Sequence, residues 1–400
     1  MTPAAIRNGR YRARTTRETI AAVDRLRGAF GITRLADITG LDRIGVPVFQ
    51  AVRPNARSVS VSLGKGLDSD AARASALMEA AELAHAETLD LPTLFAATAQ
   101  LPPDESPRTL NTWPRMRRRL SRGTRIHWVK ARELATGKAA WVPRELVRID
   151  CLDSGCADAA YFARSSNGLA SGNVRAEAIL AALCEVIERD ALAQWQALPL
   201  EQRADTRLVL DKTGDARCRA LVRRFAQRKI ALAVWDATSD VAVPCFVARI
   251  ADGADAPHAI AGSFWGAGCH PDPAIAFVRA VTEAAQSRLT LIAGARDDLE
   301  RADYAEEPDA IGAALDRWEE AQAARRLGDI VPLRAATTAG AAAALVARLR
   351  GAGFDRIFVA DLSRPGRAIA VVRAIVPGLK AAGAQVGMPE GARRSRARAA

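Results

Sequence analysis

Long apolar segments are missing from this sequence. No window reaches the roughly eighteen uninterrupted apolar residues that a membrane-spanning helix needs. The first residues, MTPAAIRNGRYRARTTRET, are rich in arginine and contain no apolar core of the kind found in secretory signals. We therefore expect a cytoplasmic protein that makes no contact with a membrane.

Cysteine, histidine and aromatic residues are scarce. The 400 residues include six cysteines and four histidines, and aromatic residues make up 5%. No two cysteines form a CxxC pair, and no group of cysteines and histidines has the spacing of a zinc site, so neither a disulfide scaffold nor a zinc finger is expected. The pattern GxxxxGK[ST] is also absent, which excludes a P-loop nucleotide site.

Positive charge is in excess, with 57 Lys and Arg against 45 Asp and Glu and a net charge of +12. Much of the excess lies in two stretches, WPRMRRRLSRGTR at 113–125 and EGARRSRARAA at the end. Short basic segments are more often solvated than docked on a nucleic acid. Nucleic acid is therefore not the expected partner, and a groove for an acidic peptide or a partner protein at 113–125 is the functional alternative.

Helical and strand patterns alternate along the chain without a strict βαβ rhythm, which predicts an α+β fold. We expect one principal domain at 61–385, completed by an N-terminal extension at 1–60 and followed by a basic disordered tail at 386–400. A hairpin is expected around Thr136, a strand with a glycine-bearing turn within 160–173, and a glycine-rich turn at 262–273. Helices are expected at about 17–30, 70–88, 175–196, 215–229 and 273–293. Further strands are expected at about 46–54, 58–66, 230–237, 243–251, 355–363 and 369–379.

One phrase of the sequence is repeated. ALMEAAE at 76–82 matches ALCEVIE at 182–188, so each expected helix carries two glutamates three residues apart, Glu79 with Glu82 and Glu185 with Glu188. Gly66 precedes Glu79 by the same interval that separates Gly172 from Glu185. A weaker third copy follows the glycines at 266 and 268 and carries Glu283 and Gln286 at the same spacing. The sequence therefore predicts three strand–turn–helix units.

Residues three apart on a helix share a face, so each unit directs a pair of side-chain oxygens the same way. Several carboxylates brought together would repel one another unless cations lie between them. Such hard oxygen ligands suit Mg²⁺, which commonly binds alongside phosphate oxygens. A single Glu-x-x-Glu is usually a solvated helix surface, but its repetition at matched spacing favours a metal–phosphate site.

Three blocks of the sequence resemble the ATP-binding blocks of the YcaO superfamily. They are SLGKGLDSDAARASALMEAAE, SNGLASGNVRAEAILAALCEVIERDA and GAGCHPDPAIAFVRAVTEAAQSR, and the resemblance extends from about Arg12 to Lys380. The segments GITRLADITGLDRIGVPVFQAVRP and VVRAIVPGLK resemble more particularly the branch that works with a TfuA partner. The resemblance implies the YcaO-type fold, in which repeated strand–turn–helix units surround a nucleotide site unlike a P-loop.

The resemblance also implies roles for individual residues. Clustered glutamates would hold Mg²⁺ ions that bridge the phosphates of ATP, and polar and basic residues would contact the nucleotide. Arg189 and Arg288 are the candidate catalytic residues, which would stabilise charge during phosphoryl transfer. The candidate metal ligands are Glu79, Glu82, Glu185, Glu188 and Glu283. The candidate nucleotide-binding residues are Lys65, Ser75, Glu79, Asn173, Glu177, Gln286 and Arg288.

Members of this superfamily phosphorylate the oxygen of a peptide-bond amide after a nucleophile has added to its carbon. Sulfide as nucleophile would give a thioamide, with a TfuA-type partner, and the resemblance to that branch favours this product. Azoline formation on a ribosomally made peptide is the alternative enzyme, and a nucleotide-binding accessory for the modification of a ribosomal protein is the non-catalytic alternative. His270 is the histidine best placed for a proton shuttle, and the oligomeric state stays open, a homodimer included.

Overall fold

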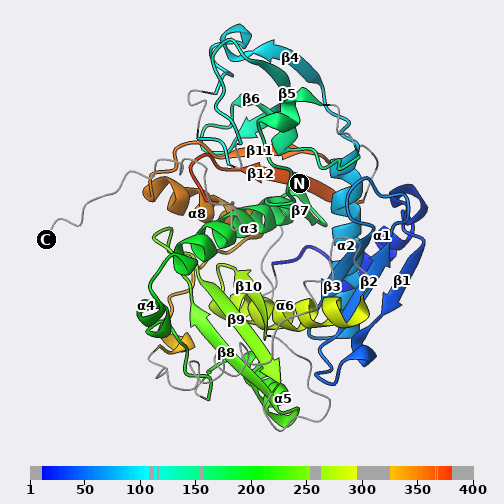
Figure 1. Cartoon of the computed structure of the whole chain (residues 1–400), viewed down its shortest axis with the longest axis vertical. Coiled ribbons are helices and arrows are strands. Elements are labelled where there is room, and N and C mark those ends of the chain that lie inside the picture. The colour runs from blue at the N-terminus through cyan, green and yellow to red at the C-terminus, as the bar shows by residue number, and fades with distance from the viewer. Residues whose placement is uncertain are drawn as a thin grey trace, which may run out of the picture. The chain divides into compact units, whose positions relative to one another are not determined.

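The computed structural model describes residues 11–107, 112–114, 117–152, 156–211, 213–252, 263–294, 325–364, 366 and 368–380. The chain divides into two compact units (Figure 1). Unit 1 comprises residues 1–13, 81–193 and 335–400, and unit 2 comprises residues 14–80 and 194–334. Within the described part of the chain, no helix is long and apolar enough to cross a membrane.

Unit 2 contains two antiparallel sheets of three strands each, with the orders β1-β2-β3 and β10-β9-β8. The strands are β1 Arg34–Asp37, β2 Val48–Val52, β3 Val61–Lys65, β8 Ile230–Asp236, β9 Cys245–Asp252 and β10 Ser263–Cys269. The helices are α1 Thr16–Asp24, α4 Leu200–Ala204, α5 Ala216–Gln227 and α6 Pro273–Ala293, together with the first part of α2 Ser69–Glu87.

The core of unit 2 lies where α5 and α6 pack against the β8–β10 sheet. Phe225 of α5, Phe246 of β9 and Phe277 of α6 are completely buried there. Helix α6 begins at Pro273, whose missing N–H costs nothing in a first helical turn, and Asp272 caps it by accepting from the N–H groups of Ala274 and Ile275. The sequence thus fixes where this helix starts relative to the strand before it.

Unit 1 is built on a six-stranded antiparallel sheet in the order β4-β5-β11-β12-β7, with β6 also paired to β5. In Figure 1, α3 and α8 run beside the β11–β12 pair. The strands are β4 Thr93–Ala97, β5 Arg125–Glu133, β6 Ala139–Pro143, β7 Leu169–Gly172, β11 Phe358–Asp361 and β12 Ala370–Ile375. The main helices are α3 Arg175–Gln196 and α8 Thr338–Gly351, and α2 continues into this unit.

Every ladder between these strands is antiparallel, and the α+β prediction is confirmed. The expected long helices are present, as is the hairpin at Thr136. Strand β7 lies within the segment 160–173, where a strand was expected. One expectation was wrong, because most of the expected turn at 262–273 is strand β10. The expected tail at 386–400 lies outside the described residues, and the domain limits stay a prediction.

Candidate functional site

The first and third repeats pack a strand glycine against the backbone of the following helix in the same register. A Cβ on Gly64 would lie 2.3 Å from the carbonyl oxygen of Ala72 and 2.0 Å from the nitrogen of Ala76. A Cβ on Gly268 would lie 2.2 Å from the oxygen of Ala276 and 2.6 Å from the nitrogen of Ala280. In both repeats, the helix atoms that approach the strand belong to residues 8 and 12 positions after the glycine. Only glycine permits strand and helix to approach this closely.

The second repeat matches the first at Gly66, which lies two residues after Gly64 and corresponds to Gly172. A Cβ on Gly66 or on Gly172 would lie 2.6 Å from a helix nitrogen six residues later, that of Ala72 or Ala178. These packing registers make Glu79, Glu185 and Glu283 equivalent positions of three similar units. They also make Glu82, Glu188 and Gln286 equivalent. The repeat seen in the sequence is therefore a repeat of local structure.

Unit 2 holds six of the predicted residues: Lys65, Ser75, Glu79, Glu283, Gln286 and Arg288. Lys65 ends β3 and donates to the Oε2 of Glu283 on α6 over 2.6 Å, with about a fifth of each side chain exposed. The Oε1 of Gln286, one turn further along α6, is buried and has no hydrogen-bond partner among the described residues. Unit 2 thus joins a lysine to a carboxylate beside an unsatisfied acceptor, an arrangement suited to a polar ligand.

Unit 1 holds the other six: Glu82, Asn173, Glu177, Glu185, Glu188 and Arg189. The Oε1 of Glu82 accepts from the backbone N–H of Ser171 over 2.8 Å and from its hydroxyl over 2.6 Å. Glu177 is buried and accepts from the backbone N–H and the side-chain amide of Asn173 at 2.9 and 3.0 Å, and from the backbone N–H of Ala13. Glu177 therefore orients Asn173 and fixes the segment that contains Ala13.

Glu185, Glu188 and Arg189 lie within a single turn of α3, so their side chains leave the helix close together. Glu188 is 3% exposed, whereas Glu185 and Arg189 are half-buried. A carboxylate as buried as that of Glu188 is costly unless it is paired with positive charge or a metal. This turn of α3 therefore supplies two hard oxygen donors and one guanidinium.

In each unit taken by itself, the predicted residues are of types that suit magnesium and a nucleotide. Unit 1 and unit 2 both contain carboxylates, which are hard oxygen donors of the type that Mg²⁺ accepts. Each unit also contains a predicted cation, Arg189 in unit 1 and Lys65 in unit 2, of the type that binds phosphate oxygens. The buried acceptor on Gln286 lacks a donor within the described structure, which is the condition expected where a ligand completes the hydrogen bonding.

Arg288 departs from the expected role. Its side chain is 1% exposed, and Nε and Nη1 donate to the carboxylates of Asp42 and Asp252, each over 3.1 Å. Its guanidinium also lies 5.6 Å from the centre of the Phe264 ring. A guanidinium committed to two buried carboxylates and an aromatic face supports the packing of α6 in unit 2. We therefore leave Arg288 out of the proposed nucleotide contacts.

Arg288→Met should lower the free energy of unfolding by about 3–5 kcal/mol, because it removes the counter-charge that faces the buried carboxylate of Asp42. It also takes one of two arginine partners from Asp252, which still pairs with Arg43. The matched control is Arg17→Met. Arg17 also pairs with a carboxylate at 3.1 Å, that of Asp70, but its side chain is 88% exposed, so a loss of less than about 1 kcal/mol is expected. Urea unfolding of both variants measures the difference. Equal stability of the two, with a raised KM for ATP in Arg288→Met, would return Arg288 to the nucleotide site.

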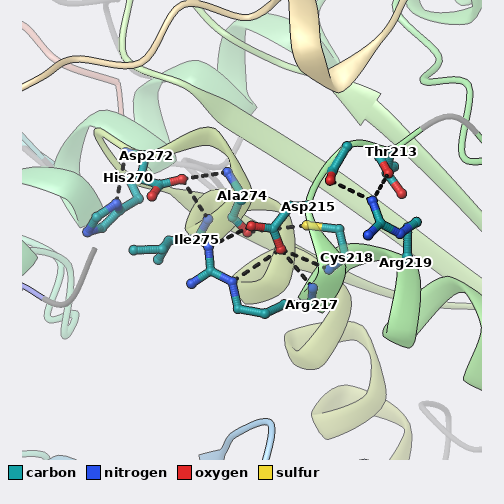
Figure 2. A network of polar contacts seen from close by, with 10 residues as sticks. Thr213, Asp215, Arg217, Cys218, Arg219, His270, Asp272, Ala274 and Ile275 are labelled. Carbon is teal, nitrogen blue, oxygen red and sulfur yellow. Dashed lines mark hydrogen bonds and ion pairs between the residues drawn. The ribbon is translucent and has the colours of Figure 1, made fainter. Parts of the chain in front are cut away.

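The start of α5 lies beside the start of α6, and Figure 2 shows Asp215 and Asp272 capping the two helices. Burial raises the pKa of the Cys218 thiol to about 12, and the Asp215 carboxylate adds to the shift. A thiol with so high a pKa stays protonated at neutral pH and is unsuited to carry sulfur. His270 uses Nδ1 to accept from the N–H of Asp272, and its predicted role as a proton shuttle stays a prediction.

Sequence reasoning missed the residues that hold Glu82 and Arg288 in place. Ser171 donates a hydrogen bond to Glu82, and Asp42 and Asp252 accept hydrogen bonds from Arg288. Asp42 lies 246 residues from Arg288 along the chain, so no local pattern connects them. Ser171 could have been noticed, because it lies within the glycine-flanked stretch of the second repeat.

Comparison with known proteins identifies one family. The family model described as YcaO cyclodehydratase, ATP- and Mg²⁺-binding, matches residues 63–380. A protein of Rhizobium leguminosarum bv. trifolii, described only as uncharacterized and lying in the tfuA 3′ region, is 35% identical over 378 residues, which are 92% of this chain and 88% of the relative. An uncharacterized protein of Methanothermobacter thermautotrophicus is 33% identical over 371 residues, which are 91% and 93% of the two chains.

Solved structures show the same fold. A heterocyclase in complex with substrate and cofactor aligns with a TM-score of 0.76 and 21% identity over 95% of this chain, which spans only 54% of the heterocyclase. The YcaO protein of Methanopyrus kandleri, solved with AMPPCP and Mg²⁺, aligns with a TM-score of 0.70 and 22% identity over 95% of both chains. At these identities the two likenesses establish fold alone.

Proposed function

Because the chain belongs to the YcaO family, whose domain binds ATP and Mg²⁺, we propose that it converts a peptide-bond amide into a thioamide. As a member of this family, it is an ATP-dependent protein of the cyclodehydratase type. Support for thioamide formation comes from the relative named for the tfuA 3′ region, which matches 92% of this chain. The same relative supports a TfuA-type protein as partner.

The proposed reaction needs ATP because an amide oxygen is a very poor leaving group. Sulfide adds to the carbonyl carbon, the oxygen takes the γ-phosphoryl group of ATP, and phosphate then departs as the carbon–sulfur double bond forms. Positioning and charge neutralisation dominate the catalysis of such phosphoryl transfers. No protein nucleophile is required, which agrees with a candidate site built from carboxylates, amides and cations.

We propose the following roles, which the sequence repeats and the family resemblance support. Glu79, Glu82, Glu185, Glu188 and Glu283 are the proposed metal ligands, and bound Mg²⁺ would neutralise the charge of the phosphates. Lys65, Ser75, Asn173 and Gln286 are proposed to bind the nucleotide, and Glu177 to position Asn173. Arg189 is proposed to stabilise the charge on the transferring phosphoryl group.

Azoline formation is the second candidate function. The family model is described by cyclodehydratase activity, and two of the structural neighbours are heterocyclases. In that reaction a cysteine, serine or threonine side chain of the substrate takes the place of sulfide. The nucleotide machinery would be the same, so the two products must be separated by their masses.

Mass spectrometry of the source organism's peptides and proteins tests the proposal. Three strains are compared: the wild type, a deletion of this gene, and the deletion complemented with Glu185→Gln. A thioamide appears as a peptide whose mass rises by the difference between sulfur and oxygen, present only in the wild type. A peptide lighter by one water would show azoline formation instead, and identical spectra from all three strains would defeat both functions.

A further inference from the structure

Three side chains of different chemistry converge in unit 1, and none of them belongs to the proposed nucleotide or magnesium site. His127 lies on β5, and Cys156 and Asp158 lie at the short 3-10 helix Ala157–Ala160. One ligand atom from each, a ring nitrogen, the sulfur and a carboxylate oxygen, lie within 4.8 Å of one another. Because all three belong to one compact unit, the cluster is fixed by local packing.

The surroundings hold these groups in place. The side chain of Asp158 is 4% exposed, and its Oδ2 accepts from the backbone N–H of His127 over 2.7 Å and lies 2.9 Å from the ring Nδ1. The imidazole also packs against the Phe95 ring, with 4.7 Å between the ring centres. Both the carboxylate and the plane of the imidazole are thus fixed before any ligand binds.

The sulfur of Cys156 has a cationic donor, because Arg144 donates to Sγ over 3.0 Å. The same guanidinium lies 3.3 Å from a carboxylate oxygen of Glu145, and Arg164 lies 3.5 Å from the other oxygen of that carboxylate. On metal binding, a thiolate and the Asp158 carboxylate would together supply two negative charges to a divalent cation.

We propose that His127, Cys156 and Asp158 bind a single Zn²⁺ ion. Nitrogen, sulfur and oxygen are the donors that zinc takes, and three protein ligands leave a fourth position for water or substrate. The 2.9 Å between Nδ1 and Oδ2 is close to the roughly 3.3 Å that two ligands of a tetrahedral zinc with bonds of about 2.0 Å would show. Binding at Nδ1 places the ring proton of His127 on Nε2, and binding at the sulfur releases the thiol proton.

A thiolate donor selects zinc over magnesium, which prefers hard oxygen ligands. The proposed zinc ligands share no residue with the proposed magnesium ligands, so the two metals are expected to bind independently. The zinc site escaped the sequence analysis because His127 and Asp158 are 31 residues apart and only Cys156 and Asp158 are close in sequence.

Cobalt titration of the purified full-length chain in excess Mg²⁺ tests the site. Co²⁺ occupies zinc sites, and a cysteine ligand gives a sulfur-to-cobalt charge-transfer absorption. We expect one equivalent of Co²⁺ with this absorption in the wild type, displaced by one equivalent of Zn²⁺. Cys156→Ser should abolish the absorption, and His127→Ala should weaken binding by about 100-fold or more.

The matched control is Cys151→Ser, because Cys151 is exposed and lies outside the cluster. It should bind Co²⁺ as the wild type does. Glu185→Gln should also keep full Co²⁺ binding, which separates this site from the proposed magnesium site. The proposal is overturned if the wild type shows no sulfur-to-cobalt absorption, or if Cys156→Ser retains it while circular dichroism shows both proteins folded.

Discussion

Glu185→Gln should lower Mg²⁺-dependent ATP turnover by about 100-fold or more, because it removes one charged oxygen from a proposed metal ligand set. The substitution keeps the size of the side chain and its helix propensity, so the fold should be unchanged. Turnover is measured with the source organism's peptide extract as substrate, and binding of a non-hydrolysable Mg–ATP analogue is measured by calorimetry. Both readouts should fall together.

The matched control is Glu201→Gln, at an exposed glutamate of the short helix α4. It should retain wild-type turnover, since its carboxylate lies on the surface and outside the repeats. The shared register of the repeats also predicts that Glu79→Gln and Glu283→Gln resemble Glu185→Gln. Normal turnover in all three folded variants would remove these glutamates from the metal site.

The helices could be predicted from sequence because their signals are local. The glutamate pairs lie on Ala-rich periodic segments, and α6 starts at an Asp-Pro pair that both caps and shapes a first turn. The prediction for 273–293 therefore agrees with α6 at both ends. The spacing from Gly66 to Glu79 and from Gly172 to Glu185 likewise anticipated the repeated strand–helix packing.

Strand β10 could not be recognised in the same way. Its sequence, SFWGAGC, contains two glycines, and glycines in a short segment usually indicate a turn. In the structure Gly266 and Gly268 are strand residues that let the backbone of α6 approach. The glycines are therefore explained by tertiary structure, because they allow β10 to pack closely against α6. A pattern within the strand's own sequence cannot show that contact.

The role of Arg288 was likewise difficult to predict from the sequence. The position follows the Glu283 and Gln286 pattern of the third repeat, which suggested a contact with nucleotide. Burial and the partners Asp42 and Asp252 decide otherwise, and neither is visible in the local sequence. The third repeat could thus be located from the sequence, whereas the partners of the Arg288 side chain could be found only in the structure.

Gly64→Ala should destabilise the protein by more than the about 1–3 kcal/mol typical of an overpacked core. The added methyl group would lie 2.0 Å from the nitrogen of Ala76 and 2.3 Å from the oxygen of Ala72. These are backbone atoms of α2, which cannot rotate aside as a side chain can, so strand and helix must separate. Urea unfolding followed by circular dichroism measures the loss, and the yield of soluble protein reports complete failure to fold.

The control is Gly40→Ala, at an exposed glycine with no atom within 4 Å of the added Cβ and no left-handed backbone. Alanine there restricts the unfolded chain, so stability should stay the same or rise by about 0.4–1 kcal/mol. Gly268→Ala should behave like Gly64→Ala, because it meets α6 in the same register. If Gly64→Ala and Gly268→Ala were both as stable as Gly40→Ala, the close strand–helix packing that places Glu79 and Glu283 at equivalent positions would be wrong, and the structural basis for assigning them a common role would be lost.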